Sequence, residues 1–357
     1  TIANRIMKEV KKDIRIYNLL QLQAHLDQYG WPKFRAKQIY HWLWKKHIRS
    51  FQEMSNLPKG IIESLENDFL ILPISVKDEQ VSSDGTIKSA FETADKKIVE
   101  GVLIPTEKRM TACISSQIGC SLACSFCATG KLKRLRNLTA SEIVDQVVEI
   151  NNQATKNYDK SLTNIVLMGM GEPLLNYSEV MKGIEMITSE DGLGMSPKRI
   201  TLSTAGISKM IRKMGDDEFR INLALSLHAA NDEKRSQIMA INDQNNLDEL
   251  ADAMNYYYSK TKQMLTFEYI IFKDFNDSLD DARDLARFCK RVPSKVNIIE
   301  YNSTDDEQFA KSPEDRVDAF VDFLTKQKIV AKVRRSRGQD IDAACGQLAN
   351  KKQVELK

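Results

Sequence analysis

The chain has 357 residues, of which 42% are hydrophobic and 28% are charged, and its formal net charge is +3. No apolar run approaches the roughly 18–20 residues that a membrane-spanning helix needs, which argues against a membrane protein. The first thirty residues carry charges throughout, so no secretory signal is expected. Six cysteines in such a chain indicate a reducing compartment, and we expect a cytoplasmic protein whose thiols serve metals or chemistry.

The first quarter of the chain has apolar residues at helical spacing. This periodicity predicts three short helices, at residues 17–30, 34–46 and 57–69. We therefore predict a small N-terminal helical domain over residues 1–75.

Positive charge is concentrated in three segments. Residues 31–60 hold seven Lys and Arg against one acid and are interleaved with aromatic residues; residues 131–136 add four positive charges, and residues 326–337 add six. Each segment alone is compatible with an ordinary solvated face. Together they favour a phosphate-rich partner such as nucleic acid.

From about residue 80 the pattern changes to β-strands. Two β-rich segments separated by a short polar turn predict a hairpin, and we expect a β-hairpin linker over residues 76–105. Apolar strand candidates then alternate with amphipathic helices; the candidates are residues 110–116, 164–170, 199–204, 221–228, 265–272 and 295–301. This alternation predicts an α/β core over residues 106–340, with a parallel sheet curled into a partial or complete barrel. An irregular tail over residues 341–357 follows.

The ends of these strands predict where a site lies. In βα barrels the active site lies at the C-terminal ends of the strands. The segment "CSLACSFCATG" follows the first strand, "GMGEP", "STAG" and "SLHA" follow the next three, and Asn302 follows the sixth. Glycine and serine are common in loops, so each segment alone is a weak signal. Their agreement in position predicts a ligand-binding rim.

Three cysteines, Cys120, Cys124 and Cys127, follow the first strand with the spacing C-x3-C-x2-C. A structural zinc site uses four protein ligands, and an electron-transfer [4Fe–4S] cluster uses four thiolates. The nearby sequence offers no fourth ligand. Three thiolates would leave one iron of a four-iron cluster open to a substrate.

This spacing, with Phe126 directly before the third cysteine, resembles the signature of the radical S-adenosylmethionine (SAM) superfamily. With "MGMGEPLLN", "TLSTAGI", "LALSLHA" and "GQDIDAACGQL", the chain is similar to the radical SAM adenine methyltransferases of 23S ribosomal RNA, from about residue 15 to residue 350. One branch of that family methylates adenine C2 and commonly also modifies the adenosine beside the anticodon of transfer RNA. A close resistance branch methylates C8, and "GEPLLN" resembles the C2 branch. The resemblance implies a radical SAM partial (β/α)6 barrel with a small N-terminal helical domain and a short β extension.

The resemblance also implies residue roles. Cys120, Cys124 and Cys127 would hold a [4Fe–4S] cluster, and two SAM molecules would be used per turnover. One SAM would methylate Cys345, in a catalytic tail, and the other would be cleaved to a 5′-deoxyadenosyl radical that takes a hydrogen from this methyl group. The resulting methylene radical would add to adenine and link protein to RNA.

Two further residues would complete the cycle. Glu100 would remove the C2 proton, and Cys113 would attack the sulfur of Cys345, forming a disulfide and releasing the product. The residues implied in SAM binding are Gly171, Glu172, Ser203, Ser226, Leu227, His228 and Asn302. Simpler interpretations remain for Cys113 as a small buried hydrophobe and for Glu100 as an exposed strand residue.

The expected partners are 23S rRNA, transfer RNA and an external electron donor such as flavodoxin or ferredoxin, and we expect a monomer. The N-terminal helical domain would bind the RNA backbone, with Lys45, Lys46 and Arg49 contacting phosphates. Three alternatives remain open at this point: a C8-methylating enzyme, a radical SAM enzyme with a non-RNA substrate, and a non-catalytic iron–sulfur or zinc module.

Overall fold

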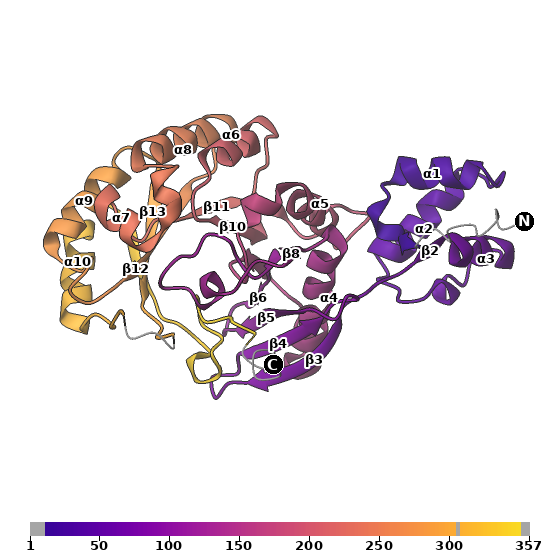
Figure 1. Ribbon diagram of the computed structural model, residues 1–357, viewed down its shortest axis with the longest axis horizontal. Helices are drawn as coiled ribbons and strands as arrows, with labels where there is room; N and C mark the ends of the chain where they lie inside the picture. Colours follow the sequence, from indigo (N-terminus) through magenta and orange to yellow (C-terminus); the bar gives the residue numbers. More distant parts are fainter. Residues whose placement is uncertain (1–10, 305–307, 351–357) are drawn as a thin grey trace, which may run out of the picture.

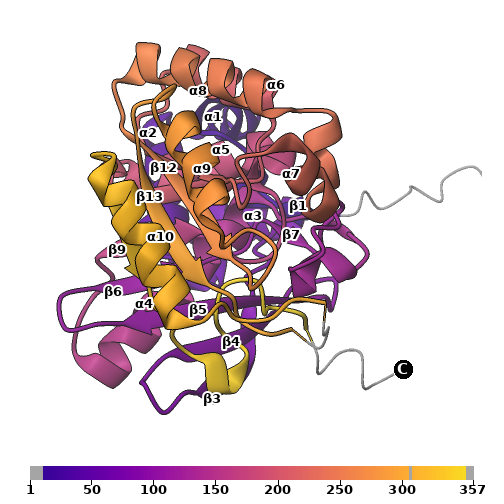
Figure 2. The same cartoon turned by 90° about the vertical axis from the view of Figure 1, so that its left-hand side faces the viewer.

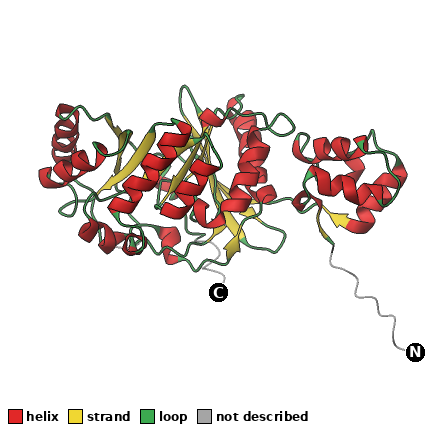
Figure 3. Ribbon diagram, turned by 90° about the horizontal axis from the view of Figure 1, so that it is seen from above, coloured by secondary structure: helices red, strands yellow, loops and turns green. Residues whose placement is uncertain are grey.

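The computed structural model describes residues 11–304 and 308–350 (Figure 1). Its N-terminal part contains three helices, α1 (Leu19–Asp27), α2 (Phe34–Trp44) and α3 (Lys59–Asp68), as predicted. A short parallel pair of strands, β1 (Lys12–Asp13) and β2 (Phe69–Leu70), closes this unit. Seen from above, the three helices form a group of their own beside the larger core (Figure 3). Residues 1–10 and 351–357, parts of the first and last predicted regions, lie outside the described residues.

A buried ion-pair network joins the helical unit to the core. The guanidinium of Arg15 lies 2.9 Å from the carboxylate of Asp13 and 2.7 Å from that of Asp145, which belongs to helix α4 (Ala140–Tyr158) of the core. Arg15 and Asp145 are both buried, so removing either one would leave an uncompensated charge. This network therefore fixes the N-terminal unit on α4.

The core contains a single ten-stranded sheet. Seven of its strands are parallel neighbours, and they are β6 (Met110–Cys113), β9 (Asn164–Leu167), β10 (Ile200–Thr204), β11 (Asn222–Ser226), β12 (Leu265–Ile271), β13 (Ser294–Glu300) and β14 (Ala331–Arg334). Every residue of β12 is buried, as expected for a strand covered on both faces. The six predicted core strands and the parallel α/β class are confirmed. In the described chain the two edges, β14 and β3, do not pair with each other, so the barrel is partial.

Three antiparallel strands extend this sheet beyond β6. They are β3 (Ser75–Val81), β4 (Ile87–Glu92) and β5 (Ile98–Pro105). The predicted hairpin is the β4–β5 pair, whereas β3 was not predicted. Because β5 also pairs with β6, the hairpin continues the core sheet as a β extension.

The helices of the core cover the outer face of the curved sheet, as the view in Figure 2 shows for α8, α9 and α10. After α4 they are α5 (Tyr177–Thr188), α6 (Ser208–Asp216), α7 (Asp232–Ile238), α8 (Leu247–Thr261), α9 (Leu279–Cys289) and α10 (Glu314–Lys326). A capping box of Thr139 and Glu142 begins α4. Helices α6 and α7 were not predicted. None of the helices in the described ranges has the length and apolarity required to span a bilayer.

Candidate active site

A cavity opens at the carboxyl ends of the parallel strands. Its lining brings together most of the predicted site residues, namely Cys120, Cys124, Cys127, Gly171, Glu172, Ser203, Ser226, His228 and Cys345. These residues come from loops that are far apart in the sequence. The residues predicted from the ends of the strands therefore lie at one common site, as parallel βα architecture requires.

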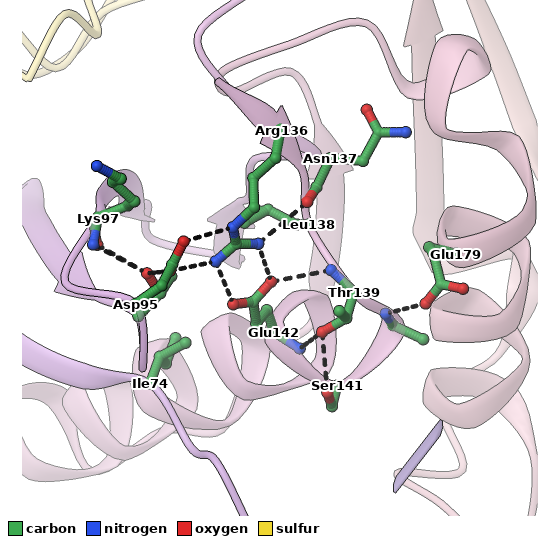
Figure 4. Close-up of polar contacts among 12 residues, drawn as sticks. Ile74, Asp95, Lys97, Arg136, Asn137, Leu138, Thr139, Ser141, Glu142 and Glu179 are labelled. Atoms are coloured by element: carbon green, nitrogen blue, oxygen red, sulfur yellow. Dashed lines mark hydrogen bonds and ion pairs between the residues drawn. The ribbon is translucent and has the colours of Figure 1, made fainter. Parts of the chain in front are cut away.

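The three-cysteine segment is a loop closed at its base, which we call the cluster loop (residues 119–135). Strands β7 (Gln117–Ile118) and β8 (Arg136–Asn137) pair antiparallel on either side of it. The guanidinium of Arg136 then bridges two carboxylates, at 2.6 Å from an oxygen of Asp95 and 2.8 Å from both oxygens of Glu142 (Figure 4). Asp95 lies between β4 and β5, and Glu142 lies in the first turn of α4. The base of the cluster loop is thus fixed to two elements of the core.

The chemistry of the cluster loop fits an iron–sulfur cluster. Burial raises the pKa of Cys120, Cys124 and Cys127, so these thiols are protonated until a metal displaces the protons. In the described ranges, no three His, Cys, Asp or Glu side chains are grouped as ligands of one metal ion. A [4Fe–4S] cluster does not require such convergence, because each cysteine binds a different iron.

Gly171 and Glu172 face the cluster loop across the cavity. Gly171 has a φ of +94°, and a Cβ atom there would lie 2.5 Å from the Cβ of Gln117, so only glycine fits. The Gln117 side chain in turn accepts the backbone N–H of Glu172 at 2.9 Å. The carboxylate of Glu172 accepts the backbone N–H groups of Leu174 and Ala205, and burial raises its pKa. Glu172 is therefore a desolvated, oriented acceptor at the cavity wall.

His228 is held in place by contacts of its ring. Its φ is +55°, and its Nδ1 accepts the backbone N–H of Ile270 at 3.0 Å. Burial lowers the pKa of His228 to about 3, and the nearby Arg235 contributes to this decrease, so the ring is neutral. The ring lies edge-on to Phe126 of the cluster loop, with 4.7 Å between centroids. Leu227, in contrast, is fully buried and lies outside the cavity lining.

The last part of the chain, residues 335–350, crosses the cavity and is called the tail. Its middle contacts the cluster loop, where Ala128 donates its N–H to the Gly346 carbonyl at 2.7 Å and Thr129 donates its hydroxyl to the Leu348 carbonyl at 2.6 Å. Asn302 does not line the cavity; its side chain donates to the carbonyl of Cys345 at 3.3 Å. These contacts hold Cys345 in the same cavity as the three cluster-loop cysteines.

Cys113 lies at the end of β6, behind the cavity lining. Burial raises the pKa of Cys113 to about 12; the neighbouring Cys345 adds to the rise, and Arg334 opposes it. Arg334, at the end of β14, lines the cavity, and its pKa is raised mainly by Cys345. Cys113 and Cys345 are therefore electrostatic neighbours with a guanidinium beside them. All six cysteines are free thiols in this structure.

Glu100 lies on β5 and its carboxylate is turned to the tail. It accepts the backbone N–H of Ala349 at 2.9 Å and of Asn350 at 3.2 Å, and Lys88 lies 3.9 Å from its other oxygen. Only 6% of the residue is exposed. The alternative of an exposed strand residue is therefore wrong, and Glu100 is an anchor of the tail.

Several residues of the basic segment 31–60 pack against the core or are buried, which the sequence did not indicate. Lys45 donates to the carbonyl of Glu190 at 3.1 Å, and Arg49 forms an ion pair with Glu149, so both contact the core. Several aromatic residues of the segment are also buried, namely Tyr40, Trp44 and Phe51. Their helical spacing reflects the core of the N-terminal unit. Lys46 remains an exposed cation of this segment.

Sequence reasoning missed three side chains of the site: Gln117, Glu268 and Arg334. Glu268 lies on β12 and lines the cavity, and its Oε2 is buried without a hydrogen-bond partner in the described chain. This oxygen lies 4.0 Å from a guanidinium nitrogen of Arg334, and a buried oxygen without a hydrogen bond at a cavity fits a ligand that donates one. A charged residue inside an otherwise uncharged strand was the available signal for Glu268, and a place in the basic segment 326–337 was the signal for Arg334.

Comparisons with known proteins agree with this architecture. The family model of the radical SAM superfamily matches residues 114–289, and that of the ribosomal RNA large subunit methyltransferase N-terminal domain matches residues 12–71. A protein of Christiangramia forsetii named "Probable dual-specificity RNA methyltransferase RlmN" is 54% identical over 97% of this chain and 98% of its own. Proteins of the same name from Salinibacter ruber and Listeria monocytogenes are 42% and 40% identical, over 96% and 94% of this chain and 95% and 93% of their own. The crystal structure of a radical SAM methyltransferase from Sphaerobacter thermophilus matches with a TM-score of 0.88 and 38% identity, over 94% of this chain and 99% of that one.

Fold, cavity and similarities together define a radical SAM methyltransferase, an enzyme class that uses a [4Fe–4S] cluster and SAM. Within that class, the chain belongs to the family of dual-specificity RNA methyltransferases RlmN. The predicted family, fold class and cofactors are thereby confirmed. Membership in an RNA methyltransferase family excludes the alternatives of a non-RNA substrate and of a non-catalytic metal module.

Proposed function

We propose that this enzyme methylates C2 of one adenine in 23S rRNA and of the adenine beside the anticodon in a transfer RNA. The observation that carries the proposal is the position of Cys345, which opens onto the same cavity as Cys120, Cys124 and Cys127. A methyl-carrying thiol needs this proximity to the site of SAM cleavage. The "GEPLLN" segment favours C2 over C8, and the names of the relatives refer to two RNA specificities.

Cys120, Cys124 and Cys127 would hold the cluster, which when bound supplies the electron that cleaves SAM. Glu172 accepts hydrogen bonds from the ammonium group of SAM, and Gly171 allows close approach of the backbone. Ser203, Ser226 and His228 line the remainder of this subsite. Leu227 contributes through the buried backbone of its loop. Asn302 contributes by holding the carbonyl of Cys345.

Cys345 carries the methyl group, and its carbon becomes bonded to C2 of adenine. Cys113 then attacks the sulfur of Cys345, so that an S–S bond forms as the S–C bond breaks. The carbon keeps the electron pair of the broken bond and takes up a proton to become the methyl group of the product. The attacking species is a thiolate, and burial holds the pKa of Cys113 at about 12. Arg334, which lowers this pKa, is placed to stabilise the thiolate.

Glu100 removes the C2 proton in this proposal, which requires a rearrangement of the tail. The backbone N–H groups of Ala349 and Asn350 occupy its carboxylate in this structure. Entry of an adenine beside Cys345 would displace the end of the tail and release Glu100. The adenine must itself leave its stack or be unpaired to reach the cavity.

The N-terminal unit would bind the RNA backbone, with Lys46 as an exposed phosphate contact. Lys45 and Arg49 are proposed instead to support the orientation of this unit on the core. We also propose a flavodoxin or ferredoxin as electron donor and action as a monomer in the cytoplasm. These last proposals rest on the sequence resemblance and composition alone.

Mass spectrometry of nucleosides from a deletion strain tests the reaction. We expect 2-methyladenosine to disappear from both 23S rRNA and transfer RNA and to return with the wild-type gene but not with Cys120→Ala. Loss of 8-methyladenosine instead would overturn C2 specificity. Loss from rRNA alone would overturn the transfer RNA substrate.

A further inference from the structure

Arg235, on helix α7, is a buried cation directly behind the cavity. Its side chain has 0% exposure. It donates hydrogen bonds to the carbonyls of Ala205, Ser226 and Leu227 at 2.6, 3.3 and 3.1 Å. These carbonyls belong to the segments at the ends of β10 and β11, which form the cavity wall. Arg235 therefore ties together two strand ends that carry predicted SAM-binding residues.

The three backbone carbonyls stabilise the charge of Arg235 through hydrogen bonds but do not neutralise it. Its remaining hydrogen bond is to the side-chain oxygen of Asn242 at 2.8 Å, and Asn242 in turn donates to Asp232 at 2.9 Å. Arg235 is absent from the ion pairs of residues 11–304 and 308–350, whereas Arg15, the other buried arginine of those ranges, contacts two carboxylates directly. Burial lowers the pKa of Arg235 to about 10, so the guanidinium stays charged at neutral pH. A buried charge without an ion pair is costly unless another group of opposite charge is close.

The group of opposite charge is at the cluster loop. The cluster loop meets the helix that carries Arg235, because Ser125, next to Cys124, donates its backbone N–H to the carbonyl of Ile238 at the end of α7 at 3.1 Å. Cys124 also lines the same cavity as Ala205 and Ser226, whose carbonyls Arg235 holds. Three thiolates carry more negative charge than an oxidised four-iron cluster carries positive charge, and reduction adds one further negative charge. Net charge and nearby charges set the reduction potential of such clusters.

We propose that Arg235 is a positioning residue that supplies the fixed positive charge stabilising the reduced state of the cluster, while its carbonyl contacts hold the SAM side of the cavity in place. The proposal rests on the proposed role of Cys124 as a cluster ligand. A positive charge in a site of low dielectric stabilises the more negative of two redox states. The Arg235 charge therefore raises the midpoint potential of the cluster.

Redox titration of the reconstituted full-length protein, monitored by electron paramagnetic resonance without SAM or RNA, tests this role. Arg235→Met removes the charge and should shift the midpoint potential to a more negative value. Arg235→Lys keeps the charge and should give a smaller shift. Asp232→Asn keeps its hydrogen-bonding oxygen but removes the negative charge behind Asn242, so it should shift the potential in the positive direction. Arg15→Met, a buried arginine at the N-terminal interface, is the matched control and should leave the potential unchanged.

The outcomes separate this proposal from the assignment of the cluster ligands. Equal midpoint potentials in all variants that contain iron would overturn the role of Arg235 alone. If Arg235→Met does not fold, Asp232→Asn decides the matter. The absence of a positive shift of the midpoint potential in this variant would then overturn the proposal. A wild-type protein that binds no cluster would instead overturn the ligand assignment on which the proposal rests.

Discussion

The cluster loop and the tail both bring cysteines to the cavity, but different kinds of contact hold them. The cluster loop is closed by its own strand pair, β7–β8, and by the ion pairs of Arg136 with Asp95 and Glu142 (Figure 4). The tail pairs with no strand along residues 335–350 of the described chain. It is held by separate hydrogen bonds to the cluster loop and to the β extension.

The hydrogen bonds at the two ends of the tail, which we call its anchors, show how the tail is held. Near its start, Gly338 donates its N–H to Asp84 at 2.9 Å, and Asp340 accepts from Ser82 at 2.5 Å. At its end, two N–H groups bind Glu100. Each anchor can open without disrupting a β-ladder, so the tail can move while the cluster loop stays fixed. A cluster needs fixed ligands, whereas a cysteine that accepts, transfers and releases a carbon needs mobility.

The largest difference between the two regions should appear on removing their cysteines. Replacing Cys120, Cys124 or Cys127 with Ala should reduce bound iron from about four atoms per chain to near zero and abolish 5′-deoxyadenosine formation, because each thiolate binds its own iron. Iron analysis and chromatography of the SAM products measure both effects. Cys289→Ala removes a buried thiol in α9 and should retain iron and activity. Normal SAM cleavage by a cluster-loop variant would contradict the assignment.

Cysteine variants of the tail and of β6 should instead keep the cluster and fail at later steps. Cys345→Ala should retain iron, never acquire a methyl group and form no RNA adduct. Cys113→Ala should proceed to the thioether and stop there, with protein covalently bound to RNA. A denaturing gel with labelled RNA, followed by ribonuclease digestion and mass spectrometry, locates the adduct at Cys345. Loss of iron in Cys345→Ala would make Cys345 a fourth ligand, and normal turnover of Cys113→Ala would make Cys113 a core residue.

The anchor at Glu100 offers a milder test of tail mobility. Glu100→Gln keeps the shape of the side chain but replaces a charged acceptor, and hydrogen bonds to charged groups contribute about 1.5–3 kcal/mol against about 1 kcal/mol for neutral ones. We expect amide hydrogen exchange at residues 345–350 to become about 3- to 30-fold faster. Glu92→Gln, on the neighbouring strand β4, is the control, because Glu92 pairs with the exposed lysines Lys77 and Lys96. Unchanged exchange in the tail of Glu100→Gln would show that this anchor does not hold it.

Local sequence patterns predicted the parts of the molecule that depend on local order. Hydrophobic periodicity identified the parallel strands, and cysteine spacing identified the cluster loop, because both features lie within a few residues of the chain. Side chains whose surroundings come from distant segments were missed. Arg235 meets the ends of β10 and β11, and Arg334 meets Cys345 only because the tail folds back over the cavity. The contact of Lys45 with the core was missed for the same reason, since its partner is 145 residues away.

The base of the cluster loop should show the smallest effect, and only as a function of pH. The hydrogen bond from Arg136 is the main reason that the pKa of Asp95 falls from 3.8 to about 2. Because the folded state lowers this pKa, the stabilisation is complete above pH 4 and is lost as the pH falls from about 4 to about 2. The pair is partly exposed, so its contribution is about 0.5–1 kcal/mol, which corresponds to about 1–2 °C in Tm for a chain of this size.

Calorimetry of Arg136→Met should give a lower Tm than wild type at pH 7, with a gap that narrows between pH 4 and pH 2. Lys133→Met removes an exposed cation of the same segment and should show no such pH dependence. A gap for Arg136→Met that stays constant down to pH 2 would mean that the ion pairs of Arg136 with carboxylates do not hold the base of the loop, leaving the β7–β8 pair to do so.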